Sequence, residues 1–100
     1  MVQVEENKVG DSKAQGIMLP SPGGEGHANM IVIECEKGYL MCGYLNLEAA
    51  EKFGDAAVLV GGADFAAVLQ NPIKGMTIAA KELGVKEGMT GEQAAKVLSV

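Results

Sequence analysis

The chain has 100 residues, of which 48% are hydrophobic, and carries a net charge of −5. This length predicts a single domain, spanning residues 1–100, around one hydrophobic core. The composition excludes a collagen-like chain and a disulfide scaffold. All eight cationic side chains are lysines, and no tryptophan is present. A chain without a basic face is a poor match for nucleic acids or anionic membranes, so we expect neither partner.

The apolar segments and the N-terminus bear on the location of the protein. Apolar runs such as Met30–Ile33 and Ala56–Val60 are far shorter than the roughly 18 residues of a transmembrane helix. Residues 1–6 have neither a basic region nor an apolar stretch, so they predict no signal peptide. Two cysteines without an export signal favour free thiols in a reducing compartment, and hence a cytoplasmic protein.

The first part of the chain predicts two short strands and a loop. Val2 and Val4 alternate with polar residues, which favours a short strand at a sheet edge. Gly16–Pro20 predicts a second strand that is stopped by its proline. The glycine- and proline-rich segment Ser21–Ala28 is expected to be a mobile surface loop.

The segment from Asn29 to Gly43 predicts a β-hairpin. We favour a two-residue turn at Lys37 and Gly38, in which Gly38 supplies a positive φ. This register separates the apolar residues from Glu34 and Glu36, whereas a three-residue turn with a bulge would shift it. The apolar face then contains Ile31, Ile33, Cys35, Leu40, Cys42 and Tyr44.

A helix and a buried strand are expected next. Asn46 is a typical N-cap for a helix over Leu47–Phe53, and Gly54 is a typical residue to end it. The apolar run Ala56–Val60 then predicts a buried strand.

Three short helices are expected to follow. Asp64 caps the first, Phe65–Gln70. The second helix is predicted by apolar residues at helical spacing, which are Met76, Ala79, Ala80 and Leu83. Thr90 has glutamine three residues later, the capping-box spacing that opens the third. The order of elements predicts an α+β domain: four strands including a hairpin, then a helix, a strand and three short helices packed on a mixed sheet.

Two sequence blocks resemble a known family. Lys37–Gly43 (KGYLMCG) and Gly88–Gly91 (GMTG) are weak signals apart and fairly specific together. With the stretch Ala79–Val85, they resemble the YunC-like family of bacteria and archaea. The resemblance runs from about Asn29 to Leu98. It implies a fold and no assigned reaction, because the function of that family is unknown.

Cys42 and Gly43, at the end of the hairpin, form the first candidate site. A thiol beside a glycine that lets a ligand approach can act as a nucleophile. Such a thiol needs a base or a positive environment to activate it. The alternative is a buried cysteine that packs as a small hydrophobic residue, and the apolar strand favours it. Gly43 is expected to lie where a side chain would clash.

Gly61, Gly62 and Asp64 form the second candidate site. They lie between a strand and a helix N-terminus, where free backbone N–H groups can form an anion cradle. The spacing matches neither a P-loop nor a dinucleotide-binding turn, and Asp64 would repel an anion, so a plain tight turn is the alternative. Asn29 is a further candidate for ligand binding. No metal is expected, because one histidine and two cysteines leave a zinc site short of ligands. No cofactor or small-molecule ligand can be named.

Two hypotheses for the function follow. The first is a non-catalytic domain that binds a metabolite or a protein partner and forms a homo-oligomer. A domain this small should leave part of the face beside Glu34 and Glu36 exposed, and exposed apolar patches mark contacts. The residues on that face are Met30, Val32, Met41 and Leu45. The second is a small enzyme that uses Cys42 as a thiol nucleophile, assisted by Asn29, Asp64 or a lysine.

Overall fold

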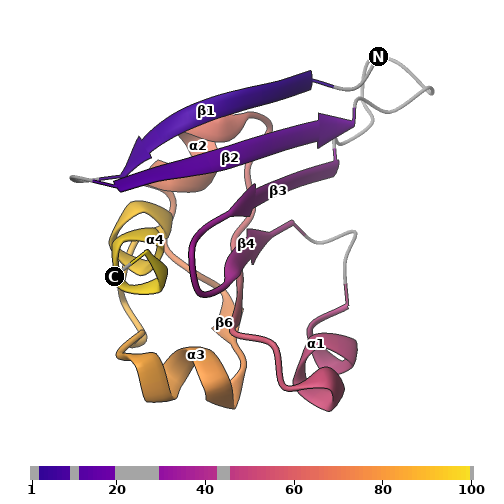
Figure 1. Cartoon of the computed structure of the whole chain (residues 1–100), viewed down its shortest axis with the longest axis vertical. Coiled ribbons are helices and arrows are strands. Elements are labelled where there is room, and N and C mark those ends of the chain that lie inside the picture. Colours follow the sequence, from indigo (N-terminus) through magenta and orange to yellow (C-terminus); the bar gives the residue numbers. More distant parts are fainter. Residues whose placement is uncertain (1–2, 10–11, 20–29, 43–45, 100) are drawn as a thin grey trace.

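A computed structural model describes residues 3–9, 12–19, 30–42 and 46–99. Its strands form one six-stranded sheet in the order β1-β2-β3-β4-β5-β6 (Figure 1). The neighbouring strands are antiparallel, except for β4 and β5, which run parallel. The predicted α+β class and mixed sheet are therefore confirmed. The strands are β1 (Gln3–Val9), β2 (Ser12–Leu19), β3 (Met30–Glu34), β4 (Tyr39–Met41), β5 (Ala57–Leu59) and β6 (Gly75–Met76), and the helices are α1 (Leu47–Phe53), α2 (Phe65–Gln70), α3 (Ile78–Leu83) and α4 (Gly91–Leu98).

The helices divide between the two faces of the sheet. Residues of α2, α3 and α4 pack on one face and form the main core with strands β1 to β5. Ala50 of α1 packs on the other face, against Met41 and Ala57. Figure 1 shows α2 behind the long β1–β2 hairpin and α1 beside the far end of the sheet. No helix in the part of the chain that the structure describes is long and apolar enough to cross a membrane.

The β3–β4 hairpin has a different turn from the predicted one. Glu34 pairs with Tyr39 and Ile33 pairs with Leu40, so the turn holds the four residues 35–38. A two-residue turn at Lys37 and Gly38 would pair Leu40 with Cys35, so the observed pairing of Leu40 with Ile33 is shifted by two residues. Because side chains alternate between faces with a period of two, this shift preserves the predicted apolar face. Of that face, Tyr44 lies outside the described residues, and the others are all buried: Ile31, Ile33, Cys35, Leu40 and Cys42.

Gly38 is required for its small size and not for a positive φ. The described glycines with a positive φ are Gly54, Gly84 and Gly88. A Cβ at Gly38 would collide with the backbone carbonyl of Ala56. The expected left-handed turn residue is therefore wrong, and close contact with the chain before β5 explains the glycine.

The two faces of the hairpin are covered unequally. Some residues of the face beside Glu34 and Glu36 were expected to stay partly exposed, but Met41 on that face is only 2% exposed because α1 covers it. Met30 and Val32 are half-buried. Leu45 lies outside the described residues.

The segment around Met76 differs most from the prediction. Met76 does not begin a helix; it belongs to β6, which pairs with β5. The helix begins after Thr77, whose hydroxyl accepts a hydrogen bond from the Ala80 N–H at 3.3 Å. Leu83 is 42% exposed, so the predicted apolar face is not buried along its whole length. Pairing with β5, rather than the periodicity of the segment, decides its conformation.

The N-terminal strands are longer than expected. β1 extends from Gln3 to Val9 and pairs with β2 along its whole length. The sequence signal at Val4 and at Gly16 marked only part of each strand, because mutual pairing extends both strands through polar residues.

Local capping signals predicted the helices well. The bounds of α1 and α2 are those expected, with Asn46 and Asp64 as N-caps. Gly54 ends α1 with a φ of 75°. The capping box of Thr90 and Gln93 is present at the start of α4.

Candidate functional site

Four of the six candidate residues lie near one end of the sheet. β4 and β5 are parallel, so their carboxyl ends meet at the same edge. The Val60 N–H donates to the Met41 carbonyl at 2.9 Å, which places Cys42 beside Val60. Gly61, Gly62 and Asp64 follow directly along the chain. The other candidates, Asn29 and Gly43, lie outside the described residues, as does the expected loop Ser21–Ala28.

The Cys42 side chain points into the main core. It is 5% exposed and packs among apolar residues. Its sulfur accepts a hydrogen bond from the Ile31 N–H at 3.2 Å, and the Cys42 N–H donates to the Ile31 carbonyl at 3.1 Å. A thiol in this setting is not presented to a substrate. The geometry favours packing over nucleophilic chemistry.

The second cysteine, Cys35, is also buried and free. Burial raises the pKa of its thiol, the side chain of Ser99 lowers it, and the negative charge of Glu34 raises it further. A raised pKa keeps this thiol protonated, and therefore unreactive, near neutral pH.

The turn that contains Gly61 and Gly62 is held by contacts to α2. A Cβ at Gly62 would lie 2.7 Å from the Val68 nitrogen, so this position packs directly on the helix backbone. Asp64 accepts a hydrogen bond from the Ala67 N–H at 2.8 Å. Asn71 donates from its side-chain nitrogen to the Gly61 carbonyl at 2.7 Å. These contacts favour the tight turn over the anion cradle.

The structure brings an unpredicted cation to this turn. A Cβ at Gly61 would lie 3.0 Å from Lys74 Nζ and 3.2 Å from Lys74 Cε. Lys74 directly precedes β6, and its N–H donates to the Leu59 carbonyl at 2.7 Å. Sequence reasoning missed this lysine because the pairing of β6 with β5 brings it back to Gly61, and β6 was not predicted.

A groove of about 990 Å³ runs along the outer edge of β6, and we call it the β6 groove. β6 is the last strand of the sheet among the described residues, and none of these pairs with the outer edge of Gly75 and Met76. Just before β6, the Ile73 N–H donates to the Met89 carbonyl at 2.9 Å and Pro72 forms a bridge with Thr90, so the open edge is limited to β6 itself. Leu47 of α1 closes one side, 3.2 Å from where a Cβ of Gly75 would lie. Figure 1 shows β6 between α1 and α3. The groove is lined by Leu47, Ile73, Lys74, Gly75, Met76, Thr77, Ile78, Lys81, Val85, Lys86, Glu87 and Gly88.

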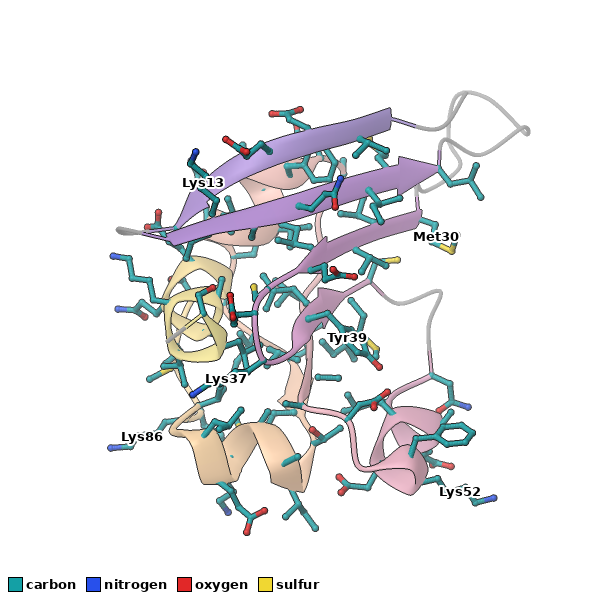
Figure 2. The ribbon with its side chains drawn as sticks, in the orientation of Figure 1. Lys13, Met30, Lys37, Tyr39, Lys52 and Lys86 are labelled. Atoms are coloured by element: carbon teal, nitrogen blue, oxygen red, sulfur yellow. The ribbon has the colours of Figure 1, made fainter. Side chains whose placement is uncertain are left out.

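The charged lining of the β6 groove is mainly positive. Lys74, Lys81 and Lys86 outnumber the single carboxylate, Glu87, although the chain as a whole has a net charge of −5. Over the described ranges, none of the three lysines forms an ion pair. Figure 2 shows Lys86 projecting outward from the surface of the molecule. The groove is therefore a positive, partly apolar surface on an acidic protein.

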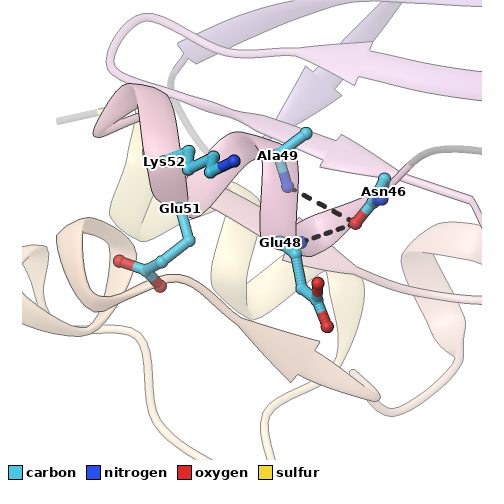
Figure 3. Close-up of a pocket in the computed structure, with 5 residues that line it drawn as sticks. All are labelled: Asn46, Glu48, Ala49, Glu51 and Lys52. Carbon is cyan, nitrogen blue, oxygen red and sulfur yellow. Dashed lines mark hydrogen bonds between the residues drawn. The ribbon is translucent and has the colours of Figure 1, made fainter.

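Two smaller depressions are explained by helix capping. One, of about 440 Å³, lies on α1 (Figure 3). Its Asn46 side chain accepts hydrogen bonds from the N–H groups of Glu48 at 2.8 Å and Ala49 at 3.4 Å. Its Glu51 carboxylate accepts one from the Ile78 N–H at 2.9 Å. The other, of about 430 Å³, includes the capping residue Thr90. The capping groups of both are already engaged within the protein.

Metal ligands do not gather at the described positions. Within those ranges, no three His, Cys, Asp or Glu side chains are placed to hold a metal ion together. The positively lined β6 groove is a setting for an anion and not for a cation.

The structure thus defines a small α+β domain with a lysine-lined groove at one edge of a mixed sheet. The chain belongs to the family described as "Domain of unknown function (DUF1805)", which it matches over residues 41–98. It is similar to the uncharacterized protein YunC of Bacillus subtilis (strain 168), with 32% identity over 71 residues, which cover 66% of this chain and 70% of that protein. The predicted YunC-like resemblance is confirmed.

A solved structure has the same fold. It is that of TA1206, a protein of unknown function from Thermoplasma acidophilum, which is 29% identical to this chain. The two superpose with a TM-score of 0.86, over 99% of this chain and 94% of the other. The likeness extends well beyond residues 41–98 and includes the N-terminal strands.

Proposed function

We propose that this chain is a single, non-catalytic binding domain whose β6 groove takes an anionic ligand. The observation that carries the proposal is the presence of three lysines and one carboxylate in a groove on a protein of net charge −5. A local positive surface on an acidic molecule attracts anions by its own field and not by the net charge. A nucleic acid is not the anion proposed, because its long phosphate backbone would extend past the groove onto the acidic remainder of the protein, which would repel it.

The ligand must offer more than charge. Exposed ion pairs contribute about 0.2–1 kcal/mol each, so three give at most about 3 kcal/mol. A millimolar complex already requires about 4 kcal/mol. The accessible apolar lining residues Ile73, Met76 and Ile78 are the surfaces that can supply the remainder. We therefore expect a ligand with both acidic and apolar groups.

The enzyme hypothesis has weaker support. Cys42 is buried, and its sulfur accepts a backbone hydrogen bond instead of facing a cavity. The lysine nearest the candidate turn, Lys74, lies against Gly61. Among the described residues, no base or cation is placed to activate the thiol. Thiol chemistry at Cys42 is therefore the less supported alternative.

Self-association is a second proposal, and a different observation favours it. On the face of the sheet that carries α1, the helix covers β4 and β5, whereas apolar side chains of β1 and β2 remain exposed. Val4 is 60%, Ile17 38% and Leu19 41% exposed. Val4 pairs with Ile17, and Ile17 with Val32, so Val4, Ile17 and Val32 form one row across three strands. Leu19 lies two residues from Ile17 along β2, on the same face. An apolar row of this kind favours contact with a second copy of the chain.

Sedimentation equilibrium of the wild type and Ile17→Lys tests self-association. We expect a species larger than 10.3 kDa for the wild type and a smaller one for the variant. A wild-type protein that stays at 10.3 kDa at high micromolar concentration would reject this proposal.

The cytoplasmic location of the protein stays a prediction.

The charged part of the ligand proposal is tested by thermal denaturation with citrate, a small tricarboxylate without apolar groups, at constant ionic strength. Because three ion pairs of at most about 3 kcal/mol correspond to a Kd of several millimolar, citrate is used at roughly 50–100 mM. A ligand at ten times its Kd stabilises the folded state by about 1.4 kcal/mol, which raises Tm by several degrees in a domain of this size. We expect this rise in the wild type and in the control Lys52→Gln, because Lys52 lies on α1 outside the groove. The double variant Lys74→Gln/Lys81→Gln should lose it. An equal rise in all three proteins would reject the groove as the site.

A further inference from the structure

We infer that the β6 groove binds an extended acidic peptide segment, which adds to the outer edge of β6 as a seventh strand. This inference rests on the proposed function and names the class of its ligand. It follows from three features of the groove: its exposed strand edge, its two unlike walls and the spread of its lysines.

The backbone of β6 offers hydrogen-bonding groups to the outside. Met76 pairs with Val58, and the next residue, Thr77, donates its N–H to the Ala57 carbonyl at 2.9 Å. In an antiparallel pair, hydrogen-bonded and non-hydrogen-bonded residue pairs alternate. Thr77 is in a hydrogen-bonded pair, so the N–H and carbonyl of Met76 point away from β5. An added strand can bond to both groups, as in other complexes formed by strand addition.

The two walls of the groove differ in chemistry. Leu47 comes from α1, which packs on one face of the sheet. Lys81 comes from α3, which packs on the opposite face, and Lys86 from the segment that follows α3. Successive side chains of an added strand point to opposite faces of the sheet. A peptide that alternates apolar and acidic residues would therefore place its apolar side chains toward Leu47 and its carboxylates toward the lysines.

The three lysines of the groove come from three different segments of the chain. Lys74 precedes β6, Lys81 lies on α3, and Lys86 follows that helix. A compact anion such as citrate offers carboxylates to the lysines but no peptide backbone to pair with the outward N–H and carbonyl of Met76. An extended chain with a carboxylate on every second residue can do both. The charge complementarity and the open strand edge together favour a peptide over a small anion.

The test is a fluorescence anisotropy titration with a fluorescein-labelled peptide, (Val-Glu)4, capped at its C-terminus as an amide. A first control peptide, (Val-Lys)4, reverses the charge. A second control peptide has the sequence of (Val-Glu)4 and carries N-methyl groups on alternate backbone amides. These groups remove the hydrogen-bond donors along one edge of the peptide and leave its side chains unchanged. Both registers of N-methylation are made, because either edge of the peptide can face β6.

We expect (Val-Glu)4 to bind, and one register of N-methylation and the charge reversal each to abolish binding. Lys81→Gln should weaken the affinity about two- to fivefold, as expected for one exposed ion pair. The matched control Lys52→Gln should leave it unchanged. Hydrogen exchange at the Met76 amide should slow when the peptide is bound, a readout that a purely electrostatic complex would not change.

The outcomes separate this inference from the proposed function. Equal binding of both N-methylated peptides and the parent would overturn strand addition. Stabilisation by citrate through Lys74 and Lys81, without any binding of (Val-Glu)4, would overturn the peptide and leave the anion site in place. Failure of citrate and of the peptide alike would overturn both. A (Val-Glu)4 complex that depends on Lys52 instead would place the peptide on α1 and also reject the inference.

Discussion

Lys74 lies alongside Gly61, close enough that a Cβ at Gly61 would be 3.0 Å from the lysine Nζ. This contact joins the candidate turn after β5 to the β6 groove. The atoms that would clash are the far end of a flexible side chain, so the backbone need not move to accommodate a methyl group.

Gly61→Ala is therefore expected to affect binding more than folding. The methyl group should displace the Lys74 ammonium group and weaken citrate binding about two- to fivefold, the usual value of one exposed ion pair. The free energy of unfolding should change by less than about 0.5 kcal/mol. Denaturant titration and citrate titration of the same preparation check both values. Unchanged citrate affinity would show that Lys74 takes no part in binding.

The neighbouring glycine should behave in the opposite way. A Cβ at Gly62 would meet the backbone nitrogen of Val68 at 2.7 Å, and a helix backbone cannot move aside as a lysine side chain can. Gly62→Ala should cost about 1–3 kcal/mol of stability. Urea denaturation measures the loss. Stability equal to that of Gly61→Ala would contradict the close packing of this turn on α2.

Thr77 is expected to be the most sensitive polar residue near the groove. It is 1% exposed, its hydroxyl donates to the Asp55 carbonyl at 2.7 Å, and it accepts from the Ala57 N–H at 3.0 Å. Thr77→Val should leave both backbone groups without this partner and cost about 2–3 kcal/mol or more. Thr77→Ser keeps the hydroxyl and should cost much less. Equal losses in the two variants, measured by urea denaturation, would assign the effect to packing.

Stability at alkaline pH should depend on Tyr39. Partial burial raises the pKa of its phenol, and the Asp55 carboxylate, which accepts its hydrogen bond at 2.9 Å, raises it further. The folded state thus holds this proton more tightly than the unfolded state. Its contribution is fully present below the ordinary pKa of tyrosine and is lost as the pH rises through the raised pKa.

Urea denaturation across that pH range compares the wild type with Tyr39→Phe. The wild type should lose stability more steeply than the variant, because the variant has no phenol to ionise. Parallel curves would show that the contact between Tyr39 and Asp55 does not control the alkaline transition. The Cys35 thiol, whose pKa is also raised, is present in both proteins and cancels in the comparison.

Cys42 is expected to react slowly while the protein is folded. Its thiol is buried and accepts the Ile31 N–H, so an alkylating reagent should modify it at pH 7 only as the protein opens. Cys42→Ala should cost about 1–2 kcal/mol for the lost packing. Mass spectrometry after brief exposure to iodoacetamide reports the rate. Rapid alkylation of the native protein would revive the thiol-enzyme hypothesis.

The elements that could be predicted from the sequence are those whose signals are local. Asn46 and Asp64 define the starts of α1 and α2 through hydrogen bonds to N–H groups two or three residues away. The hairpin face was also predictable, because a two-residue error in pairing leaves side chains on the same face. Gly38 was assigned to the wrong cause, since its contact with Ala56 joins distant parts of the chain.

The β6 groove could not be predicted, because its parts meet only through tertiary pairing. β6 has two residues and becomes a strand by pairing with β5. Leu47 precedes β6 in the sequence and Lys86 follows it, and both line the groove. A local pattern around Met76 resembled a helix, and the hydroxyl of Thr77 was not recognised as the N-cap of α3.

The most direct test of the anion site is an NMR titration of the ¹⁵N-labelled protein with citrate. The account predicts saturable shifts that cluster at the backbone amides of Lys74, Gly75, Met76 and Gly88, and that disappear in Lys74→Gln/Lys81→Gln. Figure 2 shows Lys52 and Lys86 projecting on opposite sides of the molecule, so the two regions are readily distinguished. Shifts that cluster on α1 around Lys52, or that persist in the double variant, would contradict the β6 groove as the binding site.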